Sequence, residues 1–358
     1  MLRPVLLKIH RYCGLVAALF VLVQALSGIV LIYRGELARV IDPVGMVRQS
    51  NSGNAPLSDI LIAVQRSYPE REIQRLAFPV AKDGVYFAHM ADRTGNMIYT
   101  TVDPGSSKIL STGSIWHYPT EAALLVHYQL MSGKIGLAVV ICTDLSILMM
   151  MTSGLLYWWP AKGRFAKSLT IRWNSSFRLL LRQVHRSTGI IVTIVIGTSA
   201  LTGLAMAIAM MVTPGPLSQA PAKEMPSVNW GHADRALALA QARFPGAAVR
   251  DIRMPAPGLF NIFLFAPERN PEAVHTVALD LAKTQVLATT AAANDRHIWV
   301  PMLPIHDGKT FGEAGRALIL LGGLSLVFLA ITGPLMWYQG YRRQRRKTAP
   351  ARCASDTP

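Results

Sequence analysis

The chain has 358 residues, of which 51% are hydrophobic and only 16% charged, and 36 Lys and Arg against 20 Asp and Glu give it a net charge of +16. Soluble domains average about 25% charged residues, so this composition argues against a soluble nucleic-acid-binding protein despite the basic charge. Three cysteines without a CxxC or CxxCH pair exclude a disulfide framework, a CxxC zinc site and a covalently attached haem.

Four apolar runs are each long enough to cross about 30 Å of hydrocarbon. They lie at 13–33, 135–159, 187–213 and 317–338. The first run follows three basic residues, as a signal peptide does. It is too long for one and no small-residue cleavage site follows it, so it predicts a retained span. The fold class predicted is a mainly α membrane protein with four transmembrane helices.

Nearly all of the net charge lies on one side of these spans. Residues 1–11 carry three Lys or Arg, residues 160–186 carry seven and no acid, and residues 339–358 carry six and one acid. These segments hold fifteen of the sixteen net charges, and the positive-inside rule places them and both termini in the cytoplasm. We interpret them as topology determinants that contact anionic membrane lipid, with no nucleic acid as partner.

The spacing of histidines and glycines predicts two parallel repeats. In each half one histidine is followed 18 residues later by a glycine, and a second is followed 27 residues later by another. These combinations are His10–Gly28 and His127–Gly154, then His185–Gly203 and His306–Gly333. Gly136 and Gly315 each follow the second histidine by nine residues. A span, an outer domain and a second span therefore recur in each half.

Each outer segment predicts a small α+β domain. Amphipathic helices are expected at 57–67 and 232–243, and short alternating runs such as 85–91 and 260–266 predict an antiparallel sheet beside each helix. The predicted organisation is transmembrane helix 1 at 1–34, outer domain 1 at 35–126, transmembrane helix 2 at 127–160, a basic cytoplasmic loop at 161–186, transmembrane helix 3 at 187–213, outer domain 2 at 214–305, transmembrane helix 4 at 306–340 and a basic cytoplasmic tail at 341–358.

The duplicated histidines predict two haem b groups. His10 and His185 begin spans at the cytoplasmic side, and His127 and His306 precede spans at the outer side. Two imidazoles that face each other in a helix bundle suit the axial positions of a b-type haem, which needs no cysteine. We expect each pair to bind one haem iron. The spaced glycines are expected to leave room for the porphyrin.

Neighbouring cations are candidate partners of the haem propionates. Arg11 and Arg186 adjoin the cytoplasmic pair, and Lys134, Lys309 and Arg316 lie near the outer one.

Several alternatives stay open. The glycines also suit close helix packing, and a histidine at a span end is often only an interfacial residue. His117 and His297 lie in aromatic stretches typical of an interfacial belt, and either of them could replace an outer haem ligand. Asp144 is a functional candidate as an intramembrane carboxylate, or else a packing residue. No nucleotide-binding or hydrolase motif is present.

Two stretches resemble the PepSY-associated transmembrane family. They are LLVHYQLMSGKIGLAVV at 124–140 and PIHDGKTFGEAGRALILLGGLSLVFLAITGPLMWYQGYRR at 304–343. The resemblance covers about residues 5–345, and the outer domains are similar to PepSY modules. The family includes iron-regulated proteins of the bacterial inner membrane of the ferrioxamine-reductase (FoxB-like) type, which reduce ferric siderophores at the periplasmic face through haem. By resemblance, the family's histidines map onto His10, His127, His185 and His306, and the outer domains would be periplasmic.

The resemblance implies a haem-dependent ferric-siderophore reductase that takes electrons from a cytoplasmic or quinol donor. The alternative is a membrane-anchored PepSY module that docks a periplasmic protein or peptide without redox activity. A permease component is a third expectation, and four spans with two sizeable outer domains disfavour it.

Overall fold

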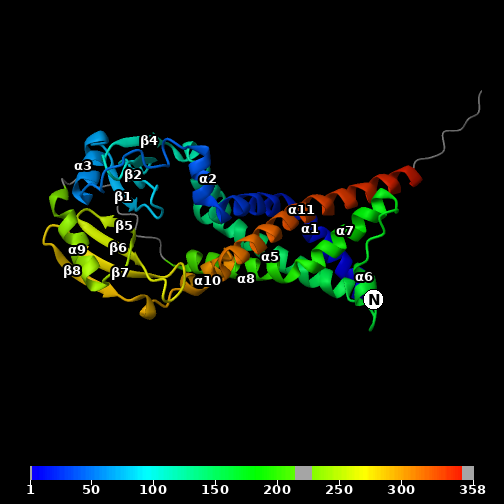
Figure 1. The fold of residues 1–358 in the computed structure, drawn as a ribbon. Coiled ribbons are helices and arrows are strands. Elements are labelled where there is room, and N and C mark those ends of the chain that lie inside the picture. Colours follow the sequence, from blue (N-terminus) through cyan, green and yellow to red (C-terminus); the bar gives the residue numbers. More distant parts are fainter. Residues whose placement is uncertain (1, 214–227, 349–358) are drawn as a thin grey trace, which may run out of the picture.

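The computed structural model describes residues 2–213 and 228–348 and consists of a helical bundle and a sheet domain (Figure 1). The bundle is built from α1 (Leu2–Ile32), α5 (Gly133–Trp158), α7 (Phe177–Ile191), α8 (Thr193–Val212) and α11 (Gly312–Thr348). Three shorter helices join it to the sheet domain, and one lies in the basic loop. These are α2 (Arg34–Ile41), α4 (Pro119–Gln129), α10 (Trp299–His306) and α6 (Phe165–Leu169).

Four helices of the described residues are long and apolar enough to cross a membrane. They are Arg3–Ile32, Gly133–Trp158, Thr193–Val212 and Lys309–Gln344. Large apolar side chains also point outward around the bundle, among them Val16, Leu19 and Ile194. In water such a surface would be unfavourable, whereas hydrocarbon accommodates it at no cost. The chain is a membrane protein, as its hydropathy predicts.

Three of the four candidate histidines lie on helices separate from the membrane spans. His127 is on α4 and His306 on α10, while His185 is on α7, which stops at Val192 before α8 begins. Positive φ values at Leu130 (47°) and Met131 (56°) separate α4 from α5. The expected continuous third span over 187–213 is therefore interrupted. Hydropathy does not detect this break because the residues on both sides of it are equally apolar.

The sheet domain contains one antiparallel sheet of eight strands. Its strands are β1 (Glu72–Ala77), β2 (Tyr86–Ala91), β3 (Met97–Val102), β4 (Ile109–Gly113), β5 (Val249–Ala256), β6 (Leu259–Phe265), β7 (Val274–Asp280) and β8 (Gln285–Thr290). Their order is β4-β3-β2-β1-β5-β6-β7-β8. Each outer segment supplies four strands, and β1 pairs with β5 with Leu76 opposite Ile252. The two segments therefore share one sheet, which the sequence patterns did not predict.

One face of this sheet is covered by α3 (Leu57–Ser67) and α9 (Ala233–Arg243) (Figure 1). Leu76 and Ile252 point into the core beneath these helices and are fully buried. Because side chains alternate along a strand, the neighbours of these two residues point to the opposite face, toward the bundle. The sheet domain thus presents a polar and aromatic face to the end of the bundle that carries His127 and His306.

We predict that Gly136→Ala destabilises the protein. A β-carbon at Gly136 would collide with the carbonyl oxygen of Gln129, in the turn that sets α4 against α5. Overpacking of this kind costs about 1–3 kcal/mol of unfolding free energy. Thermal unfolding in detergent measures the effect. Gly340→Ala is the control, because that position in α11 has nothing within 4 Å; equal unfolding temperatures for the two variants would contradict the prediction.

Candidate functional site

The structure brings the four candidate histidines together in two pairs. The ring centres of His10 and His185 are 6.4 Å apart with the planes at 89°. Those of His127 and His306 are 6.0 Å apart with the planes at 55°. The first pair lies toward the end of the bundle with the basic loop, and the second lies toward the sheet domain. All four side chains are half-buried between helices.

In the first half of the chain, each imidazole rests on a glycine of the helix that it packs against. A β-carbon at Gly28 on α1 would lie 2.9 Å from Cε1 of His127, and one at Gly154 on α5 would lie 3.1 Å from Cε1 of His10. Nδ1 of His127 is 3.0 Å from the carbonyl oxygen of Gln24. Nδ1 of His10 is 2.8 Å from that of Met150. The absence of a glycine side chain thus gives each ring access to the carbonyl oxygen of the residue four positions before the glycine.

The second half repeats this contact with one difference. His306 rests on Gly203, where a β-carbon would lie 3.1 Å from Cε1, and its Nδ1 is 3.0 Å from the carbonyl oxygen of Ser199. His185 lies further from its glycine, since a β-carbon at Gly333 would be 3.8 Å from Cε1. Its Nδ1 instead contacts the hydroxyl of Thr332 at 2.7 Å. We call each of these four contacts a histidine seat.

Each seat glycine directly follows a hydroxyl residue. The hydroxyls of Ser27 and Thr202 lie 3.3 and 3.1 Å from Nδ1 of His127 and His306. Ser153 donates to the Met150 carbonyl that His10 contacts, and Thr332 contacts His185. The signal was present in the sequence as LSG, TSG, LTG and ITG, but the hydroxyls were not predicted as site residues. The glycines lie against the imidazoles, and that they also leave room for a porphyrin stays a prediction.

The seats determine which ring nitrogen is available. A carbonyl oxygen only accepts hydrogen bonds, so Nδ1 of His10, His127 and His306 carries the proton and donates it. The Thr332 hydroxyl already donates to the carbonyl of Phe328 at 2.8 Å, so it accepts from His185. Nε2 of every ring therefore keeps its lone pair for a metal. In metal sites generally, a hydrogen bond from the ring nitrogen that does not bind the metal fixes the orientation of the imidazole.

The ring separations fit axial ligation of one iron by each pair. An imidazole nitrogen lies about 2.0–2.1 Å from a bound metal and the ring centre about 1.1 Å further along the same line, so two rings on opposite sides of one ion have centres about 6 Å apart. In the part of the chain that the structure describes, no group of three or more His, Cys, Asp or Glu is placed to hold a metal ion. Two imidazoles fit a prosthetic group that brings its own equatorial ligands, as haem does.

The candidate propionate partners lie in different surroundings. Arg11 is exposed, and Arg186 is half-buried with Nη2 3.4 Å from the carbonyl oxygen of Thr170. Lys309 forms ion pairs with Glu272 and Asp307, so its charge is already compensated.

Arg316 binds Glu36 and the carbonyl oxygen of Ile32 and stacks on Tyr33. It therefore fastens the ends of α1 and α11 together.

Asp144 lies beside the outer pair. Its side chain is buried, and its Oδ2 would be 3.5 Å from a β-carbon at Gly203, which puts the carboxyl group next to the seat of His306. Gln24 is also buried, and its Oε1 has no hydrogen-bond partner in the described part of the chain. Met150 and Met151 pack in the bundle core, where they contact buried aliphatic side chains.

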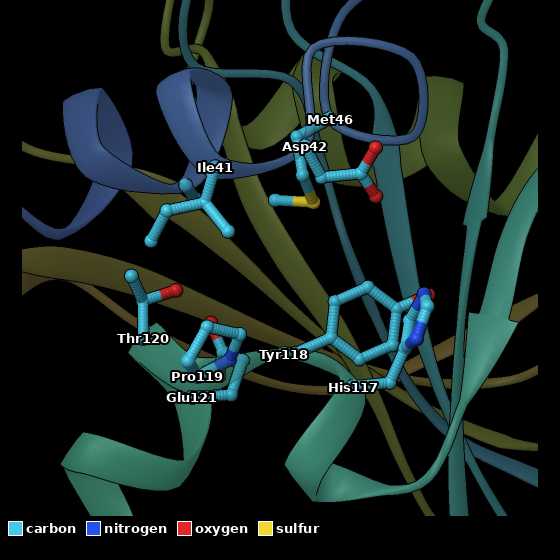
Figure 2. Close-up of a pocket in the computed structure, with 9 residues that line it drawn as sticks. Ile41, Asp42, Met46, His117, Tyr118, Pro119, Thr120 and Glu121 are labelled. Carbon is cyan, nitrogen blue, oxygen red and sulfur yellow. The ribbon is translucent and has the colours of Figure 1, made fainter.

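His117 and His297 lie outside the histidine pairs. Figure 2 shows His117 on the wall of a small pocket between α2 and the start of α4, which holds about 10 Å³, the space of a single water at most. Its Nε2 is 2.9 Å from the hydroxyl of Ser111. His297 is exposed, with Nδ1 2.6 Å from Asp295. The sheet domain holds both rings, and the pair of His127 and His306 forms without them.

We predict that Gly28→Ala disrupts the seat of His127. The added methyl group would meet the ring at 2.9 Å, so either the helices separate or the ring loses its hydrogen bond to Gln24. The unfolding temperature in detergent should fall, by an amount equivalent to about 1–3 kcal/mol. Gly35→Ala is the matched control because nothing lies within 4 Å of that position. A variant as stable as this control would show that the glycine does not support the ring.

Comparison with known proteins identifies the family. The model of the PepSY-associated TM region matches residues 7–339, which is almost the whole chain and includes all four histidine seats. No curated protein matches the chain significantly. The match agrees with the resemblance to this family that the stretches 124–140 and 304–343 show. The chain belongs to the family of the PepSY-associated TM region.

Proposed function

We propose that the protein is a di-haem reductase of the bacterial inner membrane that passes electrons from the cytoplasmic side to a periplasmic ferric siderophore and releases Fe(II) for uptake. The observation that carries this proposal is the separation of the two imidazole pairs, 6.4 and 6.0 Å between ring centres, with every Nδ1 engaged. When bound, haem b at each pair would supply one-electron redox chemistry.

The charge distribution supports an orientation for this activity. The basic segment 160–186 contains α6 and the first part of α7 and lies at the end of the bundle that carries His10 and His185, so this end is the cytoplasmic one under the positive-inside rule. The sheet domain and the pair of His127 and His306 then lie on the periplasmic side. The recurrence of the seats at equal spacing supports two parallel repeats, each with one cytoplasmic and one periplasmic histidine.

The residues of the chain would hold and separate the two redox centres. The seats fix each ring in the tautomer that leaves Nε2 free, so ligation needs no rearrangement of the imidazoles. Between the pairs the bundle core is apolar, with Ala17, Val21 and Ile147 among its buried side chains, and this excludes water from the space between the centres. The electron donor is a cytoplasmic protein or a membrane quinol.

Reduction of the iron in the substrate accounts for its release. Fe(III) in the siderophore gains one electron and becomes Fe(II), whose lower charge weakens its bonds to hard oxygen ligands. The freed ion is then available for import.

The optical spectrum of the purified protein tests the proposal. We expect a sharp Soret band that shifts on reduction with dithionite, and two haem equivalents per chain. His10→Ala and His306→Ala should each remove one equivalent, because each deprives one pair of an axial ligand. His297→Ala, at an exposed position in the sheet domain, should keep both. A colourless folded protein would favour the non-redox PepSY binding module, and loss of neither or both haems in a single variant would contradict the pairing.

We also predict that the two histidines of the second half, His185 and His306, differ in how strongly they depend on the hydroxyl of their seat. Thr332→Val removes the hydroxyl that accepts from Nδ1 of His185 and leaves no carbonyl in its place, whereas Thr202→Val leaves His306 bonded to Ser199. Loss of this hydrogen bond makes an imidazole a weaker electron donor. The midpoint potential of the haem held by His185 should rise and its affinity should fall by about tenfold.

Potentiometric titration and the haem content measure these two effects. Thr202→Val serves as the matched control and should leave both quantities nearly unchanged. Equal behaviour of the two valine variants would contradict the assignment of the Thr332 hydroxyl as the acceptor.

A further inference from the structure

A cluster of three arginines lies at the junction of the two halves of the sheet. Arg75 on β1 and Arg253 on β5 flank the buried pair of Leu76 and Ile252 and point to the opposite face, toward the bundle. Asp251 lies between them and is completely buried. With Arg250, these residues form what we call the junction cluster.

The junction cluster carries more positive than negative charge. Asp251 accepts from Nη2 of Arg75 at 3.2 Å, from Nε of Arg250 at 2.9 Å and from Nε of Arg253 at 2.9 Å. Three guanidinium groups therefore share one carboxylate, which leaves two positive charges in excess. Nε of Arg75 is also buried and has no hydrogen-bond partner in the described residues.

The pKa values of the cluster reflect this excess. Burial lowers the pKa of Arg75 from its usual value, and the neighbouring Arg253 and Arg250 lower it further although Asp251 opposes them. Burial alone would raise the pKa of Asp251, but the three arginines hold that pKa below its usual value. A second anion beside the cluster would relieve the repulsion among the guanidinium groups.

A cleft of about 920 Å³ opens beside the cluster, between the sheet and α10. Arg250 and Arg253 line it, with their guanidinium carbons 5.5 and 4.5 Å from the centre of the Phe263 ring. The side chain of Arg253 is 49% exposed, so part of its donor capacity faces solvent. Arg296 and Trp299 line the opposite side.

The acidic residues of the cleft are already engaged. Glu272 forms an ion pair with Lys309, and Asp295 contacts the ring of His297. The arginines thus leave the cleft electropositive. Its volume lies in the range of small-molecule binding sites, which is about 300–1,000 Å³.

The cleft also lies close to the outer histidine pair. Leu303 lines it and precedes His306 by three residues on α10, a rise of about 4.5 Å along the helix axis. A molecule in the cleft would therefore be separated from His306 by about one helical turn.

We propose that this cleft binds a multiply anionic, oxygen-rich iron chelate, of the ferric polycarboxylate class, through Arg253, Arg250 and Arg296. Guanidinium groups recognise carboxylates through two parallel hydrogen bonds, and Phe263 and Trp299 supply flat apolar walls. The contacts described above support binding in this cleft. That the bound chelate accepts electrons there rests on the proposed reductase function.

Calorimetric titration of the purified full-length protein with gallium(III) citrate tests the proposal, because gallium replaces ferric iron in such chelates but is not reduced. We expect saturable binding that weakens with rising salt. Arg253→Gln and Arg296→Gln should each weaken it by about tenfold. Arg296 is exposed, so its variant tests the site even if loss of Arg253 disturbs the sheet. Arg235→Gln, on the exposed side of α9 beyond the opposite face, is the control and should bind as the wild type does.

The haem content of the same samples separates the two proposals. Arginine-dependent binding to a protein without haem would support the cleft and reject the reductase. A haem-loaded protein whose affinity for gallium citrate is unchanged in both arginine variants would overturn the cleft assignment and leave the reductase standing. Preference for an uncharged gallium hydroxamate, with no effect of either arginine, would also overturn it.

Discussion

The hydrogen bond from a histidine Nδ1 to an oxygen at a glycine on the facing helix is the interaction on which the bundle depends. In the first half, α1 supplies His10 to a seat on α5 and offers its own seat at Gly28 to His127. The first contact thus joins α1 to α5 and the second joins α4 to α1, one toward each end of α1. Two such contacts about 27 Å apart along α1 fix its position against α5 and α4, since a shift of α1 by one residue would break both.

A helix in hydrocarbon has few ways to hold a polar ring. Its carbonyl oxygens are occupied by the helical ladder, but each has a second lone pair, which side chains normally cover. Glycine has no side chain to block that lone pair, and the preceding Ser or Thr places a hydroxyl beside the same carbonyl oxygen. A polar imidazole can thereby be held between helices without an unsatisfied donor, which would otherwise cost several kcal/mol. At His185 the hydroxyl alone performs this task.

The sequence predicted best those features that depend on residues near one another along the chain. The hydropathy of four runs predicted the spans, and the 18- and 27-residue spacings placed Gly28 at the level of His127 and Gly154 at the level of His10, as the structure has them. What could not be predicted depends on contacts between distant segments. The pairing of β1 with β5 rests on Leu76 meeting Ile252, 176 residues away. Asp251 appears in the sequence as one acid among several, and only folding surrounds it with three arginines.

The pairing of β1 with β5 also has a consequence for how the chain can assemble. In the matching stretches SYPEREIQRLAF and RFPGAAVRDIRM, Arg75 and Asp251 occupy corresponding positions, and they attract each other across the junction. If the first half paired with a copy of itself through β1 in the same register, Arg75 would lie diagonally across from the other Arg75, in the place that Asp251 now occupies. Like charges in these places are repulsive. The ion pair of Arg75 and Asp251 therefore favours pairing of the first half with the second half of the chain over pairing of two first halves.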